Sequence, residues 1–382
     1  MMKLWGLFLV FLLVVVVFLP VLSLYMLDVK AEGDEFYFGV SFGGESAEEA
    51  FPLIDKVKGY TNLFIVNSWG IATNQTALNL VCDYAAESGL SFIVFFAFIS
   101  RTIFPWHQQW LDEASQRWGD KFLGVYLNDE YGGKQIEKTE LFTNASDYAD
   151  AADRFVHGVK YGQNGTATSM IDAKNKGVRL FTADFVLYWW VYLADYDVVF
   201  AELGWNSSSS RQIALCRGAA RVQGKDWGTI ITYETDTPPY LGSAEKIYRY
   251  MVDSYRAGAK YVIVFNYPTY PEGNPYGILS DAHFEAMSKF WQYTQSYPWS
   301  IYGTVTADTV LVLPQDYGWG MRTPTDNIWG IWPADDKASQ ILNNVQWFES
   351  RRNLQFDIVY EDPQFDYSSL YSRVVSWNTT LS

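Results

Sequence analysis

Acidic side chains follow short apolar runs in this chain, and the clearest example is the segment 121–133, KFLGVYLNDEYGG. Its apolar first half predicts a β-strand, and its second half supplies an amide and two carboxyl groups, at Asn128, Asp129 and Glu130. Because side chains alternate between the two faces of a strand, Tyr126, Asn128 and Glu130 share one face. Asp129 lies on the opposite face. Alternation therefore favours Glu130 over Asp129 as the carboxyl group that faces a site at the strand's end.

Two later apolar runs also end in acids. Glu202 lies in the run VVFAELGW, in which residues 199, 201, 203 and 205 are all apolar, so its carboxyl group projects from the other face. Glu234 shares a strand face with Ile230 and Thr232. Any one of these acids could merely cap a helix or meet water at a strand end. Their repetition at successive strand ends favours a shared site.

Carboxyl groups that converge on one site can carry out acid–base chemistry. Like charges in a semi-enclosed site cannot all ionise cheaply, so one group keeps its proton near neutral pH. Glycoside hydrolysis needs this combination, because a carboxylic acid protonates the leaving oxygen while a carboxylate attacks the anomeric carbon or activates water. The 16 tryptophans and 27 tyrosines suit the same ligand, since sugar C–H faces stack on aromatic rings. The predicted substrate-binding positions are Asn67, Trp69, Asn128, Asp184, Trp205, Asp236, Asn266 and Tyr267.

Apolar strand patterns alternate with amphipathic helix patterns from about residue 35 onwards. Strands are predicted over 35–42, 61–68, 90–98, 121–128, 177–184, 197–203, 227–233 and 260–267. Helices are predicted over 46–60, 75–89, 108–119, 146–160, 187–194, 209–223, 243–258 and 280–295. Eight such units in about 260 residues predict an α/β fold of the (β/α)8 TIM-barrel type, with its site at the C-terminal strand ends. A doubly wound sheet is the alternative, but the turn after the first strand contains Glu45 where a phosphate-binding turn would hold an anion.

The pattern changes after residue 298, so we predict a barrel domain over 31–298 and a small α/β domain over 299–382. Strands at 309–314 and 356–360 flank a helix at 336–351, which resembles part of a flavodoxin-like domain. The tail 366–382 is predicted to add one more strand. Trp319, Trp329 and Trp332 lie in the loop 316–333, which could fold over the cleft.

The N-terminus predicts export. Residues 4–27 carry no charge, and as a helix they would reach ~36 Å, enough for the ~30 Å hydrocarbon core of a bilayer. Residues 1–30 are therefore predicted to be a signal anchor, with a cleaved signal peptide as the alternative. Both place the remainder at the cell surface or outside the cell. Glycosylation sequons at Asn74, Asn144, Asn164, Asn206 and Asn378 agree with export.

Composition excludes some partners. The net charge is −15 and the pI is about 4.6, which argues against nucleic acid, since binding it needs a basic face. Cys82 and Cys216 each fall in an amphipathic helix and are predicted to be buried free thiols. The three histidines are scattered and no CxxC or HExxH motif occurs, so we expect neither a zinc site nor a cofactor.

An acid after the fourth strand together with a glutamate after the seventh resembles the retaining TIM-barrel glycoside hydrolases of clan A. The resemblance covers about residues 35–298, and the small domain is similar to the flavodoxin-like domain of some β-galactosidase-like enzymes. It implies that Glu130 is the acid/base and Glu234 the nucleophile, with carboxyl groups ~5–5.5 Å apart if the enzyme is retaining, whereas an inverting enzyme would hold them ~6.5–9.5 Å apart. That family places an asparagine directly before the acid, whereas here Asp129 stands between Asn128 and Glu130. Both acids therefore remain candidates for the proton donor.

Three hypotheses follow. The first is an extracytoplasmic glycoside hydrolase, in which Glu202 would tune a pKa or bind a sugar hydroxyl. The second is a non-catalytic barrel that binds glycan or builds a cell-envelope assembly, in which a carboxylate would pair with a cation such as Arg101. The third is a divalent-metal hydrolase, since all-oxygen ligands suit Mg²⁺ or Ca²⁺. Its ligands would be Asp129, Glu130, Glu202 and Asp236.

Overall fold

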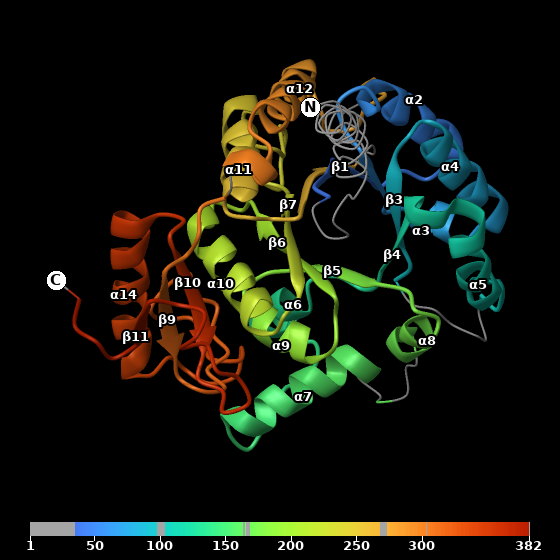
Figure 1. The fold of residues 1–382 in the computed structure, drawn as a ribbon. Coiled ribbons are helices and arrows are strands. Elements are labelled where there is room, and N and C mark those ends of the chain that lie inside the picture. Colours follow the sequence, from blue (N-terminus) through green and yellow to red (C-terminus); the bar gives the residue numbers. More distant parts are fainter. Residues whose placement is uncertain are drawn as a thin grey trace, which may run out of the picture. The chain divides into compact units, whose positions relative to one another are not determined.

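Eight parallel strands close into a barrel in the computed structural model of the protein (Figure 1). They are β1 (Tyr37–Phe42), β2 (Leu63–Val66), β3 (Ser91–Phe95), β4 (Phe122–Tyr126), β5 (Leu180–Asp184), β6 (Val198–Leu203), β7 (Asp226–Ile231) and β8 (Tyr261–Asn266). Each strand pairs with the next along the chain, and β8 pairs with β1. The structure describes residues 35–97, 104–162, 165, 169–267, 273–302 and 304–381. The predicted α/β barrel is confirmed, and closure of the sheet excludes the doubly wound alternative.

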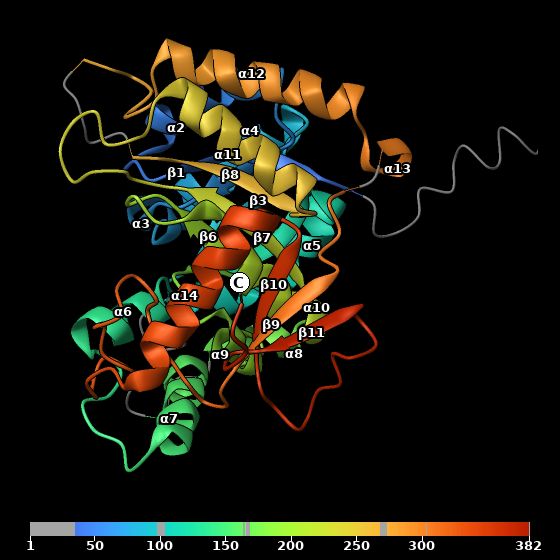
Figure 2. The same ribbon diagram turned by 90° about the vertical axis from the view of Figure 1, so that its left-hand side faces the viewer.

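Helices follow the strands and surround the barrel (Figures 1 and 2). They are α2 (Ala47–Val57), α3 (Trp69–Ala72), α4 (Gln75–Glu87), α5 (Trp106–Trp118), α6 (Tyr131–Lys138), α7 (Tyr148–Tyr161), α8 (Ser169–Asn175), α9 (Tyr188–Leu193), α10 (Ser209–Val222), α11 (Ala244–Arg256), α12 (Asp281–Ser296) and α13 (Trp299–Tyr302). The eight predicted helices are present with ends shifted by a few residues. Helices α3, α6 and α8 were not predicted, because four to eight residues are too few to show a helical period.

Alternate side chains of the strands fill the barrel interior, and large rings dominate this core. Tyr126, Phe181, Phe200 and Tyr261 all belong to it. The ring centroids of Phe181 and Phe200 lie 5.8 Å apart. Tyr126 and Phe200 therefore point as strand alternation predicts, and Glu202, two residues after Phe200 on β6, lies on the same strand face.

A second, smaller sheet follows the barrel. It has three parallel strands in the order β10 (Phe356–Tyr360), β9 (Thr309–Leu313), β11 (Arg373–Ser376), and α14 (Asp336–Arg352) connects β9 to β10. The predicted strand in the tail is thus confirmed. Figure 2 shows this sheet beside α10, against which β10 packs. Residues 37–382 form one compact unit, and both the boundary at residue 298 and the flavodoxin-like label stay predictions.

Several predictions concern residues outside the described ranges. The signal anchor over 1–30, the sequon at Asn164 and the candidate cation Arg101 all lie there. Within the described ranges, no helix is both long enough and apolar enough to cross a membrane. Cys82 and Cys216 are buried free thiols in α4 and α10, as the sequence predicted.

A candidate carboxyl site at the barrel mouth

A cavity of about 270 Å³ lies at the C-terminal ends of the barrel strands. Within the described ranges, three carboxyl groups face it, from Asp129 and Glu130 after β4 and from Glu202 on β6. The described residues that line it are Asn67, Tyr126, Asp129, Glu130, Ala183, Glu202, Trp205, Ile230, Thr232, Tyr233 and Phe265. The cavity is slightly smaller than the ~300–1,000 Å³ typical of drug-sized ligands, so its enclosed part suits a group such as one sugar ring.

Glu202 is the most deeply buried of the three acids, with 6% of its surface exposed. Its carboxyl group lies in the same cavity as that of Glu130. Burial, followed by the charges of Glu130 and Asp129, raises the pKa of Glu202 well above its usual value. Burial thus favours the protonated form of the Glu202 carboxyl group.

The backbone after β4 directs both neighbouring acids into the cavity. The strand ends at Tyr126, and Asn128 and Glu130 have positive φ values of 53° and 50°. These left-handed conformations interrupt the strict alternation of a strand. As a result Asp129 and Glu130 both line the cavity, whereas Asn128 lines a different cavity beside Tyr131. The structure thus keeps both acids as candidates.

Asp129 is held by its neighbours. The hydroxyl of Tyr126 donates a hydrogen bond to the Asp129 carboxyl group. Burial, and then the charge of Glu130, raises the pKa of Asp129 to about 7, although the Tyr126 bond acts in the opposite direction. The ammonium group of Lys134 donates to the backbone carbonyl of Asp129 at 2.6 Å. Asp129 is therefore close to half-protonated at neutral pH, with its backbone fixed.

Asp184, predicted to bind substrate, instead organises the turn that carries Glu130. It is fully buried at the end of β5, and its carboxyl group accepts the backbone N–H of Gly132 at 2.8 Å and of Phe185 at 2.6 Å. A Cβ atom at Gly132 would lie 2.6 Å from the carbonyl oxygen of Phe185, so the close approach requires glycine. Asp184 thereby fixes the first turn of α6, which begins directly after Glu130.

Glu234, predicted to be the partner of Glu130, does not line the cavity. Strand β7 ends at Ile231, three residues earlier, so strand alternation no longer controls the direction of its side chain. The carboxylate lies 2.8 Å from the ammonium group of Lys246 and accepts the backbone N–H of Asn206 at 3.2 Å. An ion pair of this kind is what the non-catalytic hypothesis expects of an acid, and among the described residues Glu234 forms it with Lys246.

Four other predicted positions also lie outside the cavity. Asp236 is exposed. Asn266 is buried and accepts the backbone N–H of Ile278 at 3.1 Å, which is a structural role. Tyr267 packs against Gly43, and Trp69 is 50% exposed on α3. Of the predicted substrate-binding residues, the cavity contains Asn67 and Trp205.

Sequence reasoning did not assign a site role to several residues that line the cavity. Tyr126 lies within β4 and Phe265 on the inward face of β8, so strand alternation could have identified both. Thr232 and Tyr233 follow the end of β7, where alternation no longer applies. The rings of Tyr233 and Phe265 pack edge to face with centroids 5.3 Å apart and form part of an aromatic wall.

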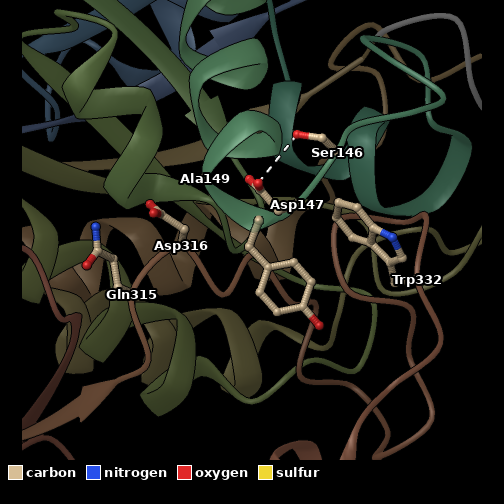
Figure 3. A pocket seen from close by; sticks show the side chains of 7 residues that line it. Ser146, Asp147, Ala149, Gln315, Asp316 and Trp332 are labelled. Atoms are coloured by element: carbon tan, nitrogen blue, oxygen red, sulfur yellow. Dashed lines mark hydrogen bonds between the residues drawn. The ribbon is translucent and has the colours of Figure 1, made fainter.

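The three tryptophans of the C-terminal loop do not belong to the carboxyl cavity. Trp319 and Trp329 are fully buried, and Trp329 packs on Trp190 of α9 with ring centroids 4.7 Å apart. Trp332 borders an open groove of about 570 Å³ with Tyr148 of α7, and Figure 3 shows this groove. The groove is lined by Ser146, Asp147, Tyr148, Ala149, Gln315, Asp316 and Trp332, and none of the described residues belongs to both this groove and the carboxyl cavity.

The described residues do not show the ligand geometry that the metal hypothesis requires. Within the described ranges, no three side chains of histidine, cysteine, aspartate or glutamate are arranged to hold a metal ion. The proposed ligand Asp236 lies outside the cavity that contains the other three acids.

The raised pKa values make the stability of the protein pH-dependent. Burial is the main cause that raises the pKa of Asp129 to about 7 and that of Asp184 to about 8, from a usual value near ~4. Between ~4 and these values the folded chain holds protons that the unfolded chain has lost. The free energy of unfolding therefore falls as pH rises through this range, by at most about 1.4 kcal/mol per pH unit for each group.

The variant Asp129→Asn tests the contribution of Asp129 to this pH dependence, because its amide can still accept the hydrogen bond from Tyr126. We expect the loss of stability between about pH 5 and about pH 8 to be smaller in this variant than in the wild type. Buried His107 and His283, whose pKa values burial lowers, act in the opposite direction in the acidic part of this range and are common to both proteins. Denaturant unfolding at several pH values measures the difference, and parallel curves would contradict the assignment.

Comparisons with known proteins add fold likeness alone. No family model and no curated protein matches this chain. An endo-1,4-beta-xylanase from Caldicellulosiruptor owensensis is 10% identical with a TM-score of 0.43, over 67% of this chain and 97% of that chain. An endo-alpha-mannosidase from Bacteroides thetaiotaomicron is 11% identical with a TM-score of 0.40, over 66% and 80%. A 3-deoxy-D-arabino-heptulosonate 7-phosphate synthase from Thermotoga maritima is 10% identical with a TM-score of 0.39, over 72% and 92%. At these values the likenesses carry no inference about activity.

Proposed function

We propose that the barrel hydrolyses O-glycosidic bonds in the carboxyl cavity and that Glu202 works there with the acids after β4. The observation that supports this most is that Glu202 and Glu130 line the same cavity, where burial and the charge of Glu130 raise the pKa of Glu202. A carboxyl group that favours its proton and a neighbouring acid thus lie together next to an aromatic wall. Acid-assisted cleavage of a glycoside requires both a proton donor and a carboxylate in one site.

The two roles follow from the environments of the acids. Glu202, whose pKa burial raises well above its usual value, is the proton donor to the leaving oxygen. Glu130 or Asp129 is the carboxylate that stabilises the developing positive charge, by direct attack or through water. The proton on Glu202 then passes to the glycosidic oxygen of the bound sugar.

This assignment differs from the clan-A pattern, in which Glu234 would be the nucleophile. Glu234 is occupied by Lys246 and lies outside the cavity, whereas Glu202 lies inside it. We therefore propose a pair drawn from β4 and β6 rather than from β4 and β7.

The lining suggests an uncharged glycoside as substrate. The rings of Tyr233 and Phe265 offer apolar faces for sugar C–H groups, and Asn67 and Thr232 offer hydrogen-bonding groups for hydroxyls. Three carboxyl groups in a small cavity would repel an acidic sugar.

The test is a screen of the full chain against neutral aryl glycosides and neutral polysaccharides, with Glu130→Gln as the matched inactive variant. Release of sugar by the wild type, lost in the variant, is the expected result. Binding of glycan with no hydrolysis of any substrate would replace this proposal by the non-catalytic glycan-binding hypothesis.

We further propose that the barrel is exported and attached to a membrane through residues 1–30. The support is the uncharged stretch at 4–27 in the sequence. Digestion of the chain by protease added to intact cells would agree with this location, and complete protection would contradict it.

A further inference from the structure

Trp205 combines three features that a core tryptophan lacks. It lines the carboxyl cavity, yet 47% of its surface is exposed. Its φ of 50° places a bulky residue in the left-handed region, where non-glycine residues are strained by about 1–3 kcal/mol. The next residue, Asn206, is also left-handed, with φ of 54°. Strain at consecutive residues persists only where the surroundings hold the chain in place.

Contacts from the segment after β7 hold this turn. The backbone N–H of Trp205 donates to the carbonyl oxygen of Tyr233 at 2.6 Å, and the two rings meet nearly at right angles with centroids 5.8 Å apart. A Cβ atom at Gly204 would lie 2.3 Å from the same carbonyl oxygen, so the two segments touch through their backbones. The end of β6 is thereby fixed directly against Tyr233, which also lines the cavity.

Glu234 holds the other half of the turn. Its carboxylate accepts the backbone N–H of Asn206, the residue that follows Trp205. The same carboxylate oxygen forms the ion pair with Lys246 of α11, and 10% of the Glu234 side chain and 28% of the Lys246 side chain are exposed. This partly buried pair links α11 to the turn after β6. Glu234 therefore influences the cavity indirectly, by holding the backbone of the residue that follows Trp205.

We propose that Trp205 is the ring on which a sugar stacks as it enters the carboxyl cavity, and that Glu234, paired with Lys246, is the residue that positions it. A half-exposed indole beside three acids suits the apolar face of an uncharged sugar ring. This inference rests on the proposed function, because the stacked sugar is the one whose bond the acids would cleave. Glu234 is then a positioning residue and not the nucleophile that the sequence predicted.

Trp205→Ala tests the stacking. It is expected to raise KM, or the dissociation constant of a neutral oligosaccharide, by about 10- to 100-fold, since it removes the apolar area that the sugar would cover. The value of kcat should change much less, because the acids remain. Trp205→Phe keeps a ring and should recover most of the affinity. The matched control is Trp69→Ala, which removes a tryptophan of nearly equal exposure, 50%, from outside the cavity and should leave KM unchanged.

Glu234→Gln tests the positioning. Its amide oxygen can still accept the Asn206 N–H but loses the ion pair, so KM should rise by a smaller factor than in Trp205→Ala while kcat is largely kept. Glu234→Ala loses both contacts and should approach the effect of Trp205→Ala. A fall in kcat of about 100-fold or more in Glu234→Gln, with KM unchanged, would overturn the inference and indicate a nucleophile.

A binding experiment separates this inference from the proposed function. Calorimetric titration of the Glu202→Gln protein with neutral oligosaccharides measures binding without hydrolysis. Suppose the wild type hydrolyses no substrate, but adding Trp205→Ala to the Glu202→Gln protein weakens oligosaccharide binding. The stacking inference is then supported and the hydrolase proposal fails. If the wild type hydrolyses and Trp205→Ala leaves both KM and binding unchanged, the hydrolase stands and the platform is overturned. Absence of both hydrolysis and binding would overturn both.

Discussion

Glu202→Gln is expected to lower kcat for glycoside hydrolysis by about 10²- to 10⁴-fold, the range that a positioned general acid contributes. The amide keeps the size of the side chain but has no acidic proton to give to the leaving oxygen. An amide at this position can still donate an N–H to the neighbouring acids of the cavity. The fold should therefore survive, and circular dichroism would check that it does.

The control for this variant is Asp236→Asn, which removes a negative charge from an exposed residue outside the cavity. It should leave kcat and KM unchanged. If Glu202→Gln retained full activity, or if Asp236→Asn lost as much, the carboxyl cavity would not be the active site. Steady-state kinetics on the best substrate of the screen measures both variants.

The second large effect is expected from the buried ion pair that joins the barrel to the small sheet. Arg217 of α10 lies 2.7 Å from Asp357 of β10, and their side chains are 7% and 0% exposed. The guanidinium group also donates to the backbone carbonyls of Leu354 and Phe356, and the hydroxyl of Tyr371 donates to Asp357. Arg217→Ala should therefore cost about 3–5 kcal/mol of unfolding free energy, because the buried Asp357 carboxylate loses its closest cation and keeps only Arg221, at 3.8 Å, and the Tyr371 hydroxyl.

Two controls distinguish this penalty from a general loss of packing. The double variant Arg217→Met with Asp357→Leu removes both charges and should recover a large part of the lost stability. Arg154→Ala removes the exposed ion pair between Arg154 and Asp150 on α7 and should leave stability nearly unchanged. Denaturant unfolding measures all three variants. Equal stability of Arg217→Ala and the wild type would show that the two charges contribute little to the contact.

The barrel was predictable because each strand is an apolar run of the right length, separated from the next by a helix-length pattern. Helix α6 was not predictable in this way, since its first turn contains Gly132 and Gly133, which disfavour helix. That turn forms because Asp184, about fifty residues later in the chain, accepts the Gly132 N–H. Such a long-range contact leaves no local signal in the sequence.

Strand alternation located site residues only as far as each strand extends. It placed Glu202 on the face it occupies, because Glu202 lies within β6. It could not place Asp129 or Glu234, because β4 ends at Tyr126 and β7 ends at Ile231. Beyond a strand end, backbone torsions such as the positive φ of Glu130 decide where a side chain points, and these depend on tertiary contacts.

The central claim is that the carboxyl cavity holds a proton on Glu202 at neutral pH, ready for the leaving group. Infrared spectroscopy tests it most directly, because a protonated carboxyl group has a C=O stretching band that a carboxylate lacks. The difference spectrum between wild type and Glu202→Gln at about pH 7 should contain this band, lost in the variant. A difference spectrum that shows the loss of a carboxylate instead would mean that Glu202 is ionised, and it would contradict the proposed acid.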